Sequence, residues 1–270
     1  MAGTGKLLLV GCGKMGGAML EGWLEQGLLP ADLAIVEPSE SNRPKVAGAA
    51  VVAAADQVPA GFAPDIVVLA VKPQTMNDVL PGLRRFVGGS TTFLSIAAGK
   101  TIGYFRAGLG DGARIVRAMP NTPAAVRRGV TVCVAGPGVS EAAKARCSSL
   151  LSAVSEVLWT ADEGLMDAVT AVSGSGPAYV FLLAEAMAEA GVKAGLPGDM
   201  AMTLARATVA GSGELLRRSS EPAAQLRVNV TSPGGTTAEA LKILMSDIGI
   251  QPLFDSAIAA ATRRSKELAG

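Results

Sequence analysis

The residues with the clearest chemical potential form a short polar stretch near the end of the sequence. It reads V-N-V-T-S-P-G-G-T-T over residues 228–237 and precedes a helical pattern at residues 238–244. The proline fixes one backbone angle, the two glycines permit close approach of the backbone to a ligand, and Thr236 or Thr237 is expected to cap the helix. A helix N-terminus presents free N–H groups and positive potential, so this stretch could bind an anion. A capped loop without a ligand is the alternative interpretation.

A second candidate site follows the first apolar run of the sequence. That run, residues 6–10, is followed by G-C-G-K-M-G at residues 11–16 and by an amphipathic segment at residues 17–26. In G-x-G-x-x-G the first glycine makes a tight turn, the second admits a pyrophosphate and the third lets the helix pack on the strand. Glu37 lies roughly 20 residues after the last motif glycine, where an acid would bind a ribose hydroxyl. We therefore predict a dinucleotide site rather than a purely structural turn, formed by Glu37 and by Gly11, Gly13, Lys14, Met15 and Gly16.

Two further polar residues follow predicted strands. Residues 65–71 form a continuous apolar run that ends at Lys72. Residues 114–119 run into P-N-T-P, whose two prolines are expected to prevent a helix and to hold Asn121 and Thr122 in a fixed turn. Ligands of parallel sheets bind beyond the carboxyl ends of the strands. Lys72 and Asn121 are thus placed to meet a cofactor or substrate, although a solvated lysine in a turn is an equally open interpretation of Lys72.

Histidine is absent from the whole sequence. Its absence excludes the commonest general base, the usual zinc ligand and every Ser-His-Asp or Cys-His arrangement. Most carbonyl reductases need a proton donor such as His, Lys or Tyr, and the only tyrosines are Tyr104 and Tyr179. A protonated C=N bond does not need one, because hydride converts it to a neutral amine. The residues therefore favour imine reduction through positioning and electrostatics.

The first part of the sequence alternates between strands and helices. Apolar runs predict strands at residues 6–10, 33–36, 50–54, 65–71, 91–99, 114–119, 129–135 and 155–159, with a helix at residues 140–153 between the last two. Continuous apolar runs are typical of parallel strands that are buried on both faces. The sequence thus predicts an α/β Rossmann-type N-terminal domain with a parallel sheet.

The composition changes after residue 160, where β-branched runs give way to Ala, Leu, Met, Glu and Lys at helical spacing. Helices are predicted at residues 163–172, 176–194, 197–218, 222–228, 236–247 and 252–267. The helix at 176–194 has little polar surface beyond Glu185 and Glu189, so we expect its burial against another subunit. The predicted domains are a dinucleotide-binding domain at residues 1–160 and an all-α domain at residues 161–270.

Charge and cysteine content exclude several classes of protein. Lys and Arg total 24 against 23 Asp and Glu, without a run of like charge, which predicts no nucleic-acid partner. The three cysteines, Cys12, Cys133 and Cys147, form no C-x-x-C pair. This pattern indicates a reducing compartment and no structural metal site. We expect the cysteines to be small buried apolar residues. No uncharged segment reaches the roughly 20 residues that cross a bilayer. We therefore expect a cytoplasmic protein without a membrane partner.

Five motifs, in this order and at these separations, resemble those of the Δ1-pyrroline-5-carboxylate reductase family, the last enzyme of proline biosynthesis. They are G-C-G-K-M-G at 11–16, V-K-P at 71–73, R-A-M-P-N-T-P at 117–123, S-G-S-G-P-A-Y at 173–179 and V-T-S-P-G-G-T-T at 230–237. The first is generic, whereas M-P-N-T-P, S-G-S-G-P-A-Y and T-S-P-G-G-T-T are specific, and the resemblance covers nearly the whole chain. It implies reduction of (S)-1-pyrroline-5-carboxylate to L-proline by NADPH or NADH, with hydride delivered to the C=N carbon.

The resemblance also implies an assembly and a substrate site. In the family the C-terminal helices of two subunits interlock as a homodimer, often assembled further into a decamer, and the active site combines both subunits. Ser232 and the backbone of Gly235 and Thr236 would bind the substrate carboxylate. Thr237, the catalytic candidate, would hydrogen-bond the ring nitrogen, and residues 173–179 would mainly shape the helix and the site.

For the cofactor, the resemblance implies that the glycines of residues 11–16 receive the pyrophosphate and that Lys72 and Asn121 line the nicotinamide side. Glu37 would repel the 2′-phosphate of NADPH, yet the polar side chains at residues 39–43 could accept one. The choice between NADPH and NADH therefore stays open.

The nearest enzymatic alternative is an oxidoreductase like the β-hydroxyacid dehydrogenases, which also join a Rossmann domain to a helical one. That family places an essential lysine four residues before an asparagine, whereas Lys193 here precedes Pro197 and Lys242 precedes Ser246 at that offset. The chain therefore lacks the lysine and asparagine pair that a β-hydroxyacid dehydrogenase requires. A non-catalytic nucleotide sensor is the alternative from a different class.

Overall fold

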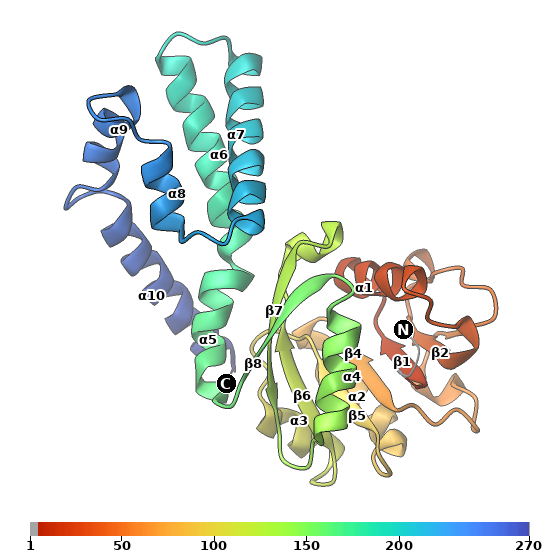
Figure 1. The fold of residues 1–270 in the computed structure, drawn as a ribbon. Helices are drawn as coiled ribbons and strands as arrows, with labels where there is room; N and C mark the ends of the chain where they lie inside the picture. Colours follow the sequence, from red (N-terminus) through yellow and green to blue (C-terminus); the bar gives the residue numbers. More distant parts are fainter. Residues whose placement is uncertain (1–4, 270) are drawn as a thin grey trace. The chain divides into compact units, whose positions relative to one another are not determined.

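The computed structural model describes residues 5–269, which form two compact units (Figure 1). Unit 1 contains residues 5–174 and 262–269, and unit 2 contains residues 175–261. The units separate after Gly174, whereas the domain boundary predicted from composition lies at residue 160 and stays a prediction. The outer limits of the predicted domains, residues 1 and 270, lie outside the described residues.

Within its described residues, unit 1 is built on an eight-stranded sheet with the order β3-β2-β1-β4-β5-β6-β7-β8. The strands are β1 (Leu7–Val10), β2 (Leu33–Val36), β3 (Ala50–Val52), β4 (Ile66–Leu69), β5 (Thr92–Ser95), β6 (Arg114–Met119), β7 (Gly129–Ala135) and β8 (Ser155–Thr160). Strands β1 to β6 run parallel, so their carboxyl ends share one edge of the sheet, which we call the ligand edge. The Rossmann-type α/β fold predicted for this part of the chain is confirmed.

Strand β7 departs from the parallel sheet that the sequence predicts. It pairs antiparallel to β6, with Met119 opposite Val132. The chain between them contains only the short 3₁₀ helix Thr122–Val126, which the two prolines did not prevent. A parallel strand would need a crossover connection of a dozen or more residues, so a reversal is the geometry that this short link allows.

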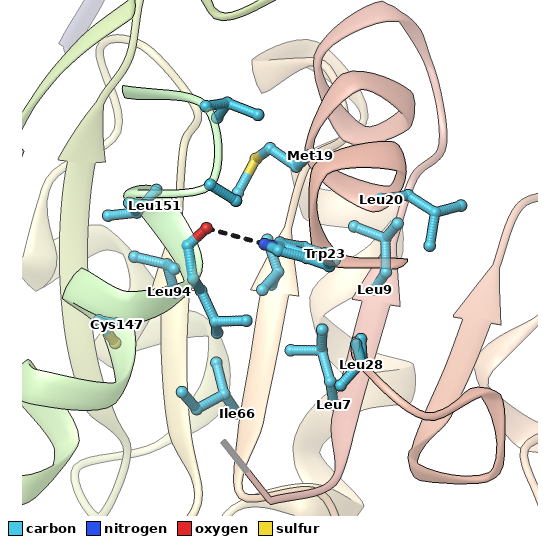
Figure 2. Packing of buried hydrophobic residues seen from close by; sticks show 14 of the residues in the cluster. Leu7, Leu9, Met19, Leu20, Trp23, Leu28, Ile66, Leu94, Cys147 and Leu151 are labelled. Atoms are coloured by element: carbon cyan, nitrogen blue, oxygen red, sulfur yellow. Dashed lines mark hydrogen bonds between the residues drawn. The ribbon is translucent and has the colours of Figure 1, made fainter. Parts of the chain in front are cut away.

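The sheet separates two layers of apolar side chains. Successive residues of a strand point to opposite faces, so Leu7 joins one core cluster with Trp23 while Leu8 joins the other with Phe105. The ring N–H of Trp23 donates to the carbonyl oxygen of Leu150 at 2.8 Å (Figure 2). Burial on both faces explains why the strand sequences are continuous apolar runs.

Helices of unit 1 contribute to both layers. Those in the layer of Leu7 are α1 (Lys14–Glu25) and α4 (Glu141–Leu151), and those in the layer of Leu8 are α2 (Met76–Leu83), α3 (Ile102–Leu109) and α5 (Met166–Val169). The sequence did not predict α2 and α3, because Pro81 lies inside α2 and Gly103 and Gly108 lie inside α3. Both residue types lower helix propensity, and tertiary burial overrides that preference here.

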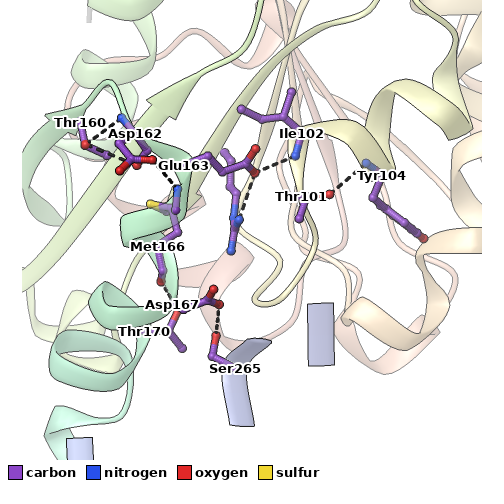
Figure 3. A network of polar contacts seen from close by, with 12 residues as sticks. Thr101, Ile102, Tyr104, Thr160, Asp162, Glu163, Met166, Asp167, Thr170 and Ser265 are labelled. Carbon is purple, nitrogen blue, oxygen red and sulfur yellow. Dashed lines mark hydrogen bonds and ion pairs between the residues drawn. The ribbon is translucent and has the colours of Figure 1, made fainter. Parts of the chain in front are cut away.

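The last turns of α10 (Ile250–Ala269) also belong to unit 1. The hydroxyl of buried Ser265 donates to the carboxylate of Asp167 at 2.6 Å. Glu163 accepts from the backbone N–H of Ile102 at 2.8 Å and from the guanidinium of buried Arg117 at 3.0 Å (Figure 3). These contacts tie β6, the start of α3 and the end of α10 to the segment at residues 163–167.

Unit 2 is helical. It contains α6 (Gly176–Lys193), α7 (Gly198–Arg218), α8 (Ala223–Asn229), α9 (Thr236–Leu244) and the larger part of α10. Helices α6 and α7 pack through small side chains, because Ala188, Ala201 and Ala205 form their buried cluster. Large apolar side chains remain exposed on the same two helices, among them Phe181 and Leu204. The all-α C-terminal region predicted from the sequence is confirmed.

Candidate active site

The glycine motif forms an open turn at the end of β1. Gly11 has φ +92°, a conformation that L side chains rarely adopt, and a Cβ on Gly16 would collide with the carbonyl oxygen of Gly11. A Cβ on Gly13 would meet nothing within 4 Å, so the space above this residue is free for a ligand. Gly13 is also the N-cap of α1 and supplies no side-chain cap. The uncapped N–H groups at this helix start can therefore donate hydrogen bonds to an anion.

Helix α1 begins at Lys14, inside the motif, and not at residue 17 as the sequence suggested. Lys14 is exposed at the first helical position, and Met15 is half-buried against the core. The earlier start brings two predicted cofactor residues onto the helix that faces the open turn.

Glu37 follows β2 and is buried, with 6% of its surface exposed. Its carboxylate accepts from the backbone N–H of Cys12 at 2.7 Å and from that of Ser39 at 2.8 Å. Burial and the Glu37 charge raise the pKa of the Cys12 thiol to about 11. The carboxylate therefore holds the glycine turn and the end of β2 together at the ligand edge.

A cavity of about 550 Å³ opens beyond the carboxyl ends of β1 to β4. It is lined mainly by small apolar residues, namely Val10, Val36, Pro38, Ala53, Ala54, Ala55, Val71, Val79 and Gly82, together with Asp56, Thr75 and Asp78. Its walls are apolar and it lies beside Glu37, which fits the flat ring of a nucleotide base. The sequence analysis missed this cavity, because its lining comes from several separate segments without a polar motif.

Lys72 lies just beyond β4, at the position expected from the strand end. Its side chain is exposed, and its backbone carbonyl accepts from the backbone and the hydroxyl of Thr75 at 3.1 and 3.0 Å. Among the described residues its ammonium group has no partner, so it is available to a ligand at this edge.

Asn121 lies beyond β6 at the same edge and is the N-cap of the 3₁₀ helix. Its amide oxygen accepts from the backbone N–H of Val130 at 2.9 Å, and its amide nitrogen donates to the carbonyl oxygen of Ser173 at 3.2 Å. Both ends of this side chain are therefore engaged by the protein itself.

The polar stretch near the C-terminus forms a tight turn before α9 in unit 2. Gly235 N–H donates to the carbonyl oxygen of Ser232 at 3.0 Å, and Gly234 has φ +68°, as a type II turn with proline at its second position requires. Gly235 is the N-cap, and the helix begins at Thr236. The prediction that Thr236 or Thr237 caps α9 is wrong, because the glycine already adopts the extended cap conformation one residue earlier.

The four predicted substrate residues lie together on this turn. No side-chain cap occupies the N-terminus of α9. Among the described residues, the hydroxyls of Ser232, Thr236 and Thr237 have no hydrogen-bond partner, and Thr237 is half-buried. A helix N-terminus surrounded by unpaired hydroxyls is suited to a carboxylate with a neighbouring polar group.

The predicted cofactor residues are brought together at the ligand edge of unit 1. Gly11, Glu37, Lys72 and Asn121 follow the carboxyl ends of β1, β2, β4 and β6, respectively. Beyond these, the geometry adds Ser173 and Glu163 as partners of site segments. The resemblance had already implied that the segment of Ser173 shapes the site, but its contact with Asn121, 52 residues away, and the role of Glu163 could not be predicted from the sequence.

The described residues lack a metal cluster and a membrane-spanning helix. They contain no cluster of three or more His, Cys, Asp or Glu side chains that could hold a metal ion. They also contain no helix with the length and apolar character that crossing a membrane requires.

Comparison with known proteins identifies relatives of the whole chain. Residues 163–268 match the family model for pyrroline-5-carboxylate reductase dimerisation, and residues 6–99 match that for coenzyme F420-dependent NADP oxidoreductases. The pyrroline-5-carboxylate reductases of Pseudomonas aeruginosa and Synechocystis are each 40% identical to the chain. The first alignment covers 98% of this chain and 97% of the relative, and the second covers 97% and 98%.

Solved structures give the same result. The pyrroline-5-carboxylate reductase of Coxiella burnetii matches with a TM-score of 0.90 and 34% identity over 99% of both chains. The Plasmodium falciparum pyrroline carboxylate reductase with NADP bound matches with a TM-score of 0.80 and 31% identity over 98% of both chains. With relatives this similar along almost its entire length, the chain belongs to the pyrroline-5-carboxylate reductase family.

Proposed function

We propose that this chain reduces (S)-1-pyrroline-5-carboxylate to L-proline with hydride from NADH or NADPH. The observation that carries the proposal is the uncapped N-terminus of α9 with three hydroxyls that have no partner among the described residues, in a chain 40% identical to known pyrroline-5-carboxylate reductases. The substrate is an anion with an electrophilic C=N bond, so it needs a carboxylate site and a hydrogen bond at nitrogen. The turn at residues 231–237 offers both.

Each residue of the turn has a role that follows from its chemistry. Ser232 and the backbone N–H groups of Gly235 and Thr236 bind the substrate carboxylate, with the helix dipole adding favourable potential. The hydroxyl of Thr237 hydrogen-bonds the ring nitrogen. Because hydride adds to carbon and the nitrogen of the protonated imine already carries its proton, the product is a neutral amine and the protein does not have to supply a proton to nitrogen. Orientation of the reacting partners accounts for the catalysis.

The cofactor supplies the hydride. The open turn at Gly11, Gly13 and Gly16, with Lys14 and Met15 on the first turn of α1, binds the pyrophosphate, and the apolar cavity beside Glu37 holds the adenine. The exposed ammonium group of Lys72 lines the nicotinamide side of the ligand edge.

The test is a spectrophotometric assay of pyrroline-5-carboxylate reduction with each nicotinamide donor. We expect cofactor oxidation that depends on the substrate, and no oxidation with a 3-oxo acid. Both lysines that a β-hydroxyacid dehydrogenase could use are in exposed ion pairs, Lys193 with Glu189 and Lys242 with Glu239. Absence of turnover with either donor would reject the reductase and favour a nucleotide sensor.

We further propose that the chain prefers NADH to NADPH. The buried Glu37 carboxylate beside the glycine turn would accept a hydrogen bond from a ribose 2′-hydroxyl and repel a 2′-phosphate. Arg43, a cation of the same loop, is partly committed, since its guanidinium donates to the carbonyl oxygens of Glu37 and Pro38 at 2.8 and 3.0 Å.

Glu37→Gln tests this preference. The amide keeps an acceptor for one backbone N–H but removes the charge, so the ratio of kcat/KM for NADH over NADPH should fall about tenfold or more, the scale of a lost charge-assisted hydrogen bond. Glu40→Gln is the matched control, because it removes one exposed carboxylate from the same loop and should leave the ratio unchanged. An unchanged ratio in Glu37→Gln would exclude this acid as the determinant.

We also propose that two copies of the chain pair through the helices of unit 2, that the dimers assemble further into a decamer, and that the enzyme acts in the cytoplasm. The dimerisation family model at residues 163–268 and the exposed apolar side chains of α6 and α7 support the pairing.

A further inference from the structure

A π-helical turn connects α5 to α6 at Thr170–Gly174. Such turns are rare and are frequently found at functional sites. In an α-helix the carbonyl of Ser173 would accept from the residue four positions later, but that residue is Pro177, which has no N–H. The N–H five positions later, of Ala178, donates to Ser175 at 3.0 Å instead. The Ser173 carbonyl therefore lacks both donors that a helix would supply.

The amide of Asn121 takes the place of those donors, since its nitrogen donates to the Ser173 carbonyl at 3.2 Å. The other end of the same amide extends the sheet. Pairing of β6 with β7 stops at Met119 and Val132, and Asn121 lies opposite Val130 in the same register. Its side-chain oxygen accepts from the Val130 N–H at 2.9 Å, where a strand carbonyl would otherwise be needed.

Apolar contact fixes the same two segments against each other. A Cβ on Gly174 would collide with the terminal methyl of Met119, so a larger residue at this position would displace the end of the Met119 side chain. The Ser173 hydroxyl donates to the carbonyl oxygen of Val169 at 2.9 Å and holds the turn from within. The end of β6 and the loop that follows it are therefore held against the π-helical turn by one amide and one side-chain contact.

We propose that Asn121 is a positioning residue for the reductase reaction rather than a cofactor ligand. Its amide fixes the turn from which the chain leaves unit 1 for α6, and so sets the geometry of the S-G-S-G-P segment. This inference rests on the proposed function, because the positioned segment is taken to serve hydride transfer. The amide acts through Ser173 and Val130.

Asn121→Asp separates the two hydrogen bonds. The carboxylate keeps an acceptor for the Val130 N–H but loses the donor to Ser173. We expect kcat/KM for pyrroline-5-carboxylate to fall about ten- to hundredfold, the scale of a small displacement of reacting groups. The dissociation constant of NADH, measured by fluorescence titration, should stay unchanged in Asn121→Ala, which carries no added charge.

Pro177→Ala provides the rescue, because it restores an N–H four residues after Ser173. In the Asn121→Asp background it should recover a large part of the lost kcat/KM. Thr91→Ala is the matched control. Its hydroxyl donates to the carbonyl oxygen of Pro64 at 2.8 Å and is also half-buried, but it lies at the start of β5, away from the ligand edge. This variant should lower Tm without changing kcat or KM.

Hydrogen exchange of residues 170–179 gives a readout that does not require turnover. Exchange should accelerate in Asn121→Asp and Asn121→Ala but not in Thr91→Ala, whether or not the wild-type chain reduces pyrroline-5-carboxylate. Unchanged exchange, failure of Pro177→Ala to restore activity, or a loss confined to NADH affinity would each overturn the positioning role.

Discussion

At the scale of single residues, Thr237 is the side chain on which the proposed chemistry depends most. Its hydroxyl is half-buried on the first turn of α9 and, among the described residues, has no protein partner. Thr237→Ala should reduce kcat/KM for pyrroline-5-carboxylate by about ten- to hundredfold, the scale of one hydrogen bond to a charged group, and should leave the KM of the cofactor unchanged.

Thr237→Ser is the control for that measurement, because it keeps the hydroxyl and removes only a methyl group. It should retain most of the activity. Equal losses for substrate and cofactor in the alanine variant would move this turn away from the proposed carboxylate site.

Cys12 leads to a prediction about pH. Burial and the Glu37 carboxylate raise the pKa of its thiol from 9.0 to about 11. The thiolate is the reactive form, so at pH 8 Cys12 should react with iodoacetamide about a hundredfold more slowly than an ordinary thiol, and its rate should still rise above pH 9. Mass spectrometry of the labelled peptide measures the rate, and fast labelling at pH 7 would contradict the prediction.

The same shift affects stability. Because the pKa of the folded state exceeds that of the unfolded state, the folded protein retains the proton between pH 9 and 11. The stabilisation from Cys12 is therefore complete below pH 9 and is lost as the pH rises towards 11. A Cys12→Ala variant should show a weaker decline of Tm over that interval.

At the scale of secondary-structure elements, the ion pair of Arg117 and Glu163 joins β6 to the start of α3. Arg117 is buried, and Glu163 also accepts from the N–H of Ile102 (Figure 3). Glu163→Ala would leave a buried guanidinium unpaired and should lower the free energy of unfolding by about 1–3 kcal/mol. Urea unfolding measures this loss.

Asp111→Ala serves as the comparison for that loss. Its carboxylate pairs with Arg106 at 3.3 Å but is almost fully exposed, so its removal should change the free energy of unfolding by at most about 1 kcal/mol. Equal effects of the two variants would mean that burial of Arg117 does not decide the energetics.

Elements whose pattern lies within a few adjacent residues could be predicted from the sequence. The strand Leu33–Val36 and the glycine turn after β1 were predicted from a few adjacent residues, because burial on both faces and a required positive φ constrain residue type directly. The antiparallel direction of β7 could not, because it depends on a pairing between Met119 and Val132 that no local pattern encodes.

The features of the candidate site likewise fall into those that the sequence predicts and those that it does not. Its glycines, hydroxyls and strand-end residues were visible as types and spacings. The contact of Asn121 with Ser173, 52 residues away, was not, and neither was the burial of Glu37 against the Cys12 N–H. These features arise from tertiary packing, which gives a polar residue its partner without marking the sequence around it.

At the scale of the whole molecule, the exposed apolar side chains of unit 2 should be covered by a second copy of the chain. Phe181 and Leu204 are 62% and 50% exposed, which a soluble monomer would not favour. Phe181→Asp or Leu204→Asp should shift the protein towards the monomer and reduce its activity, as measured by light scattering during gel filtration and by turnover at matched concentration.

Leu29→Asp is the comparison for this experiment. Leu29 is 63% exposed in unit 1, outside the segment matched by the dimerisation family model. The variant should keep the assembly state of the wild-type protein. A monomeric wild-type protein with full activity would reject the pairing.

The last turns of α10 have a consequence for biosynthesis of the chain. Ser265, buried against Asp167, and Leu268, whose backbone lies beside Gly99, complete unit 1 although all of unit 2 separates them from it in sequence. On the ribosome the sheet emerges early, but these residues emerge only after the whole of unit 2. Closing so long a loop is a slow, non-local step. Unit 1 therefore receives its last contacts only after unit 2 has been synthesised, and a nascent chain that stalls within unit 2 lacks the contact of Ser265 with Asp167 and that of Leu268 with Gly99.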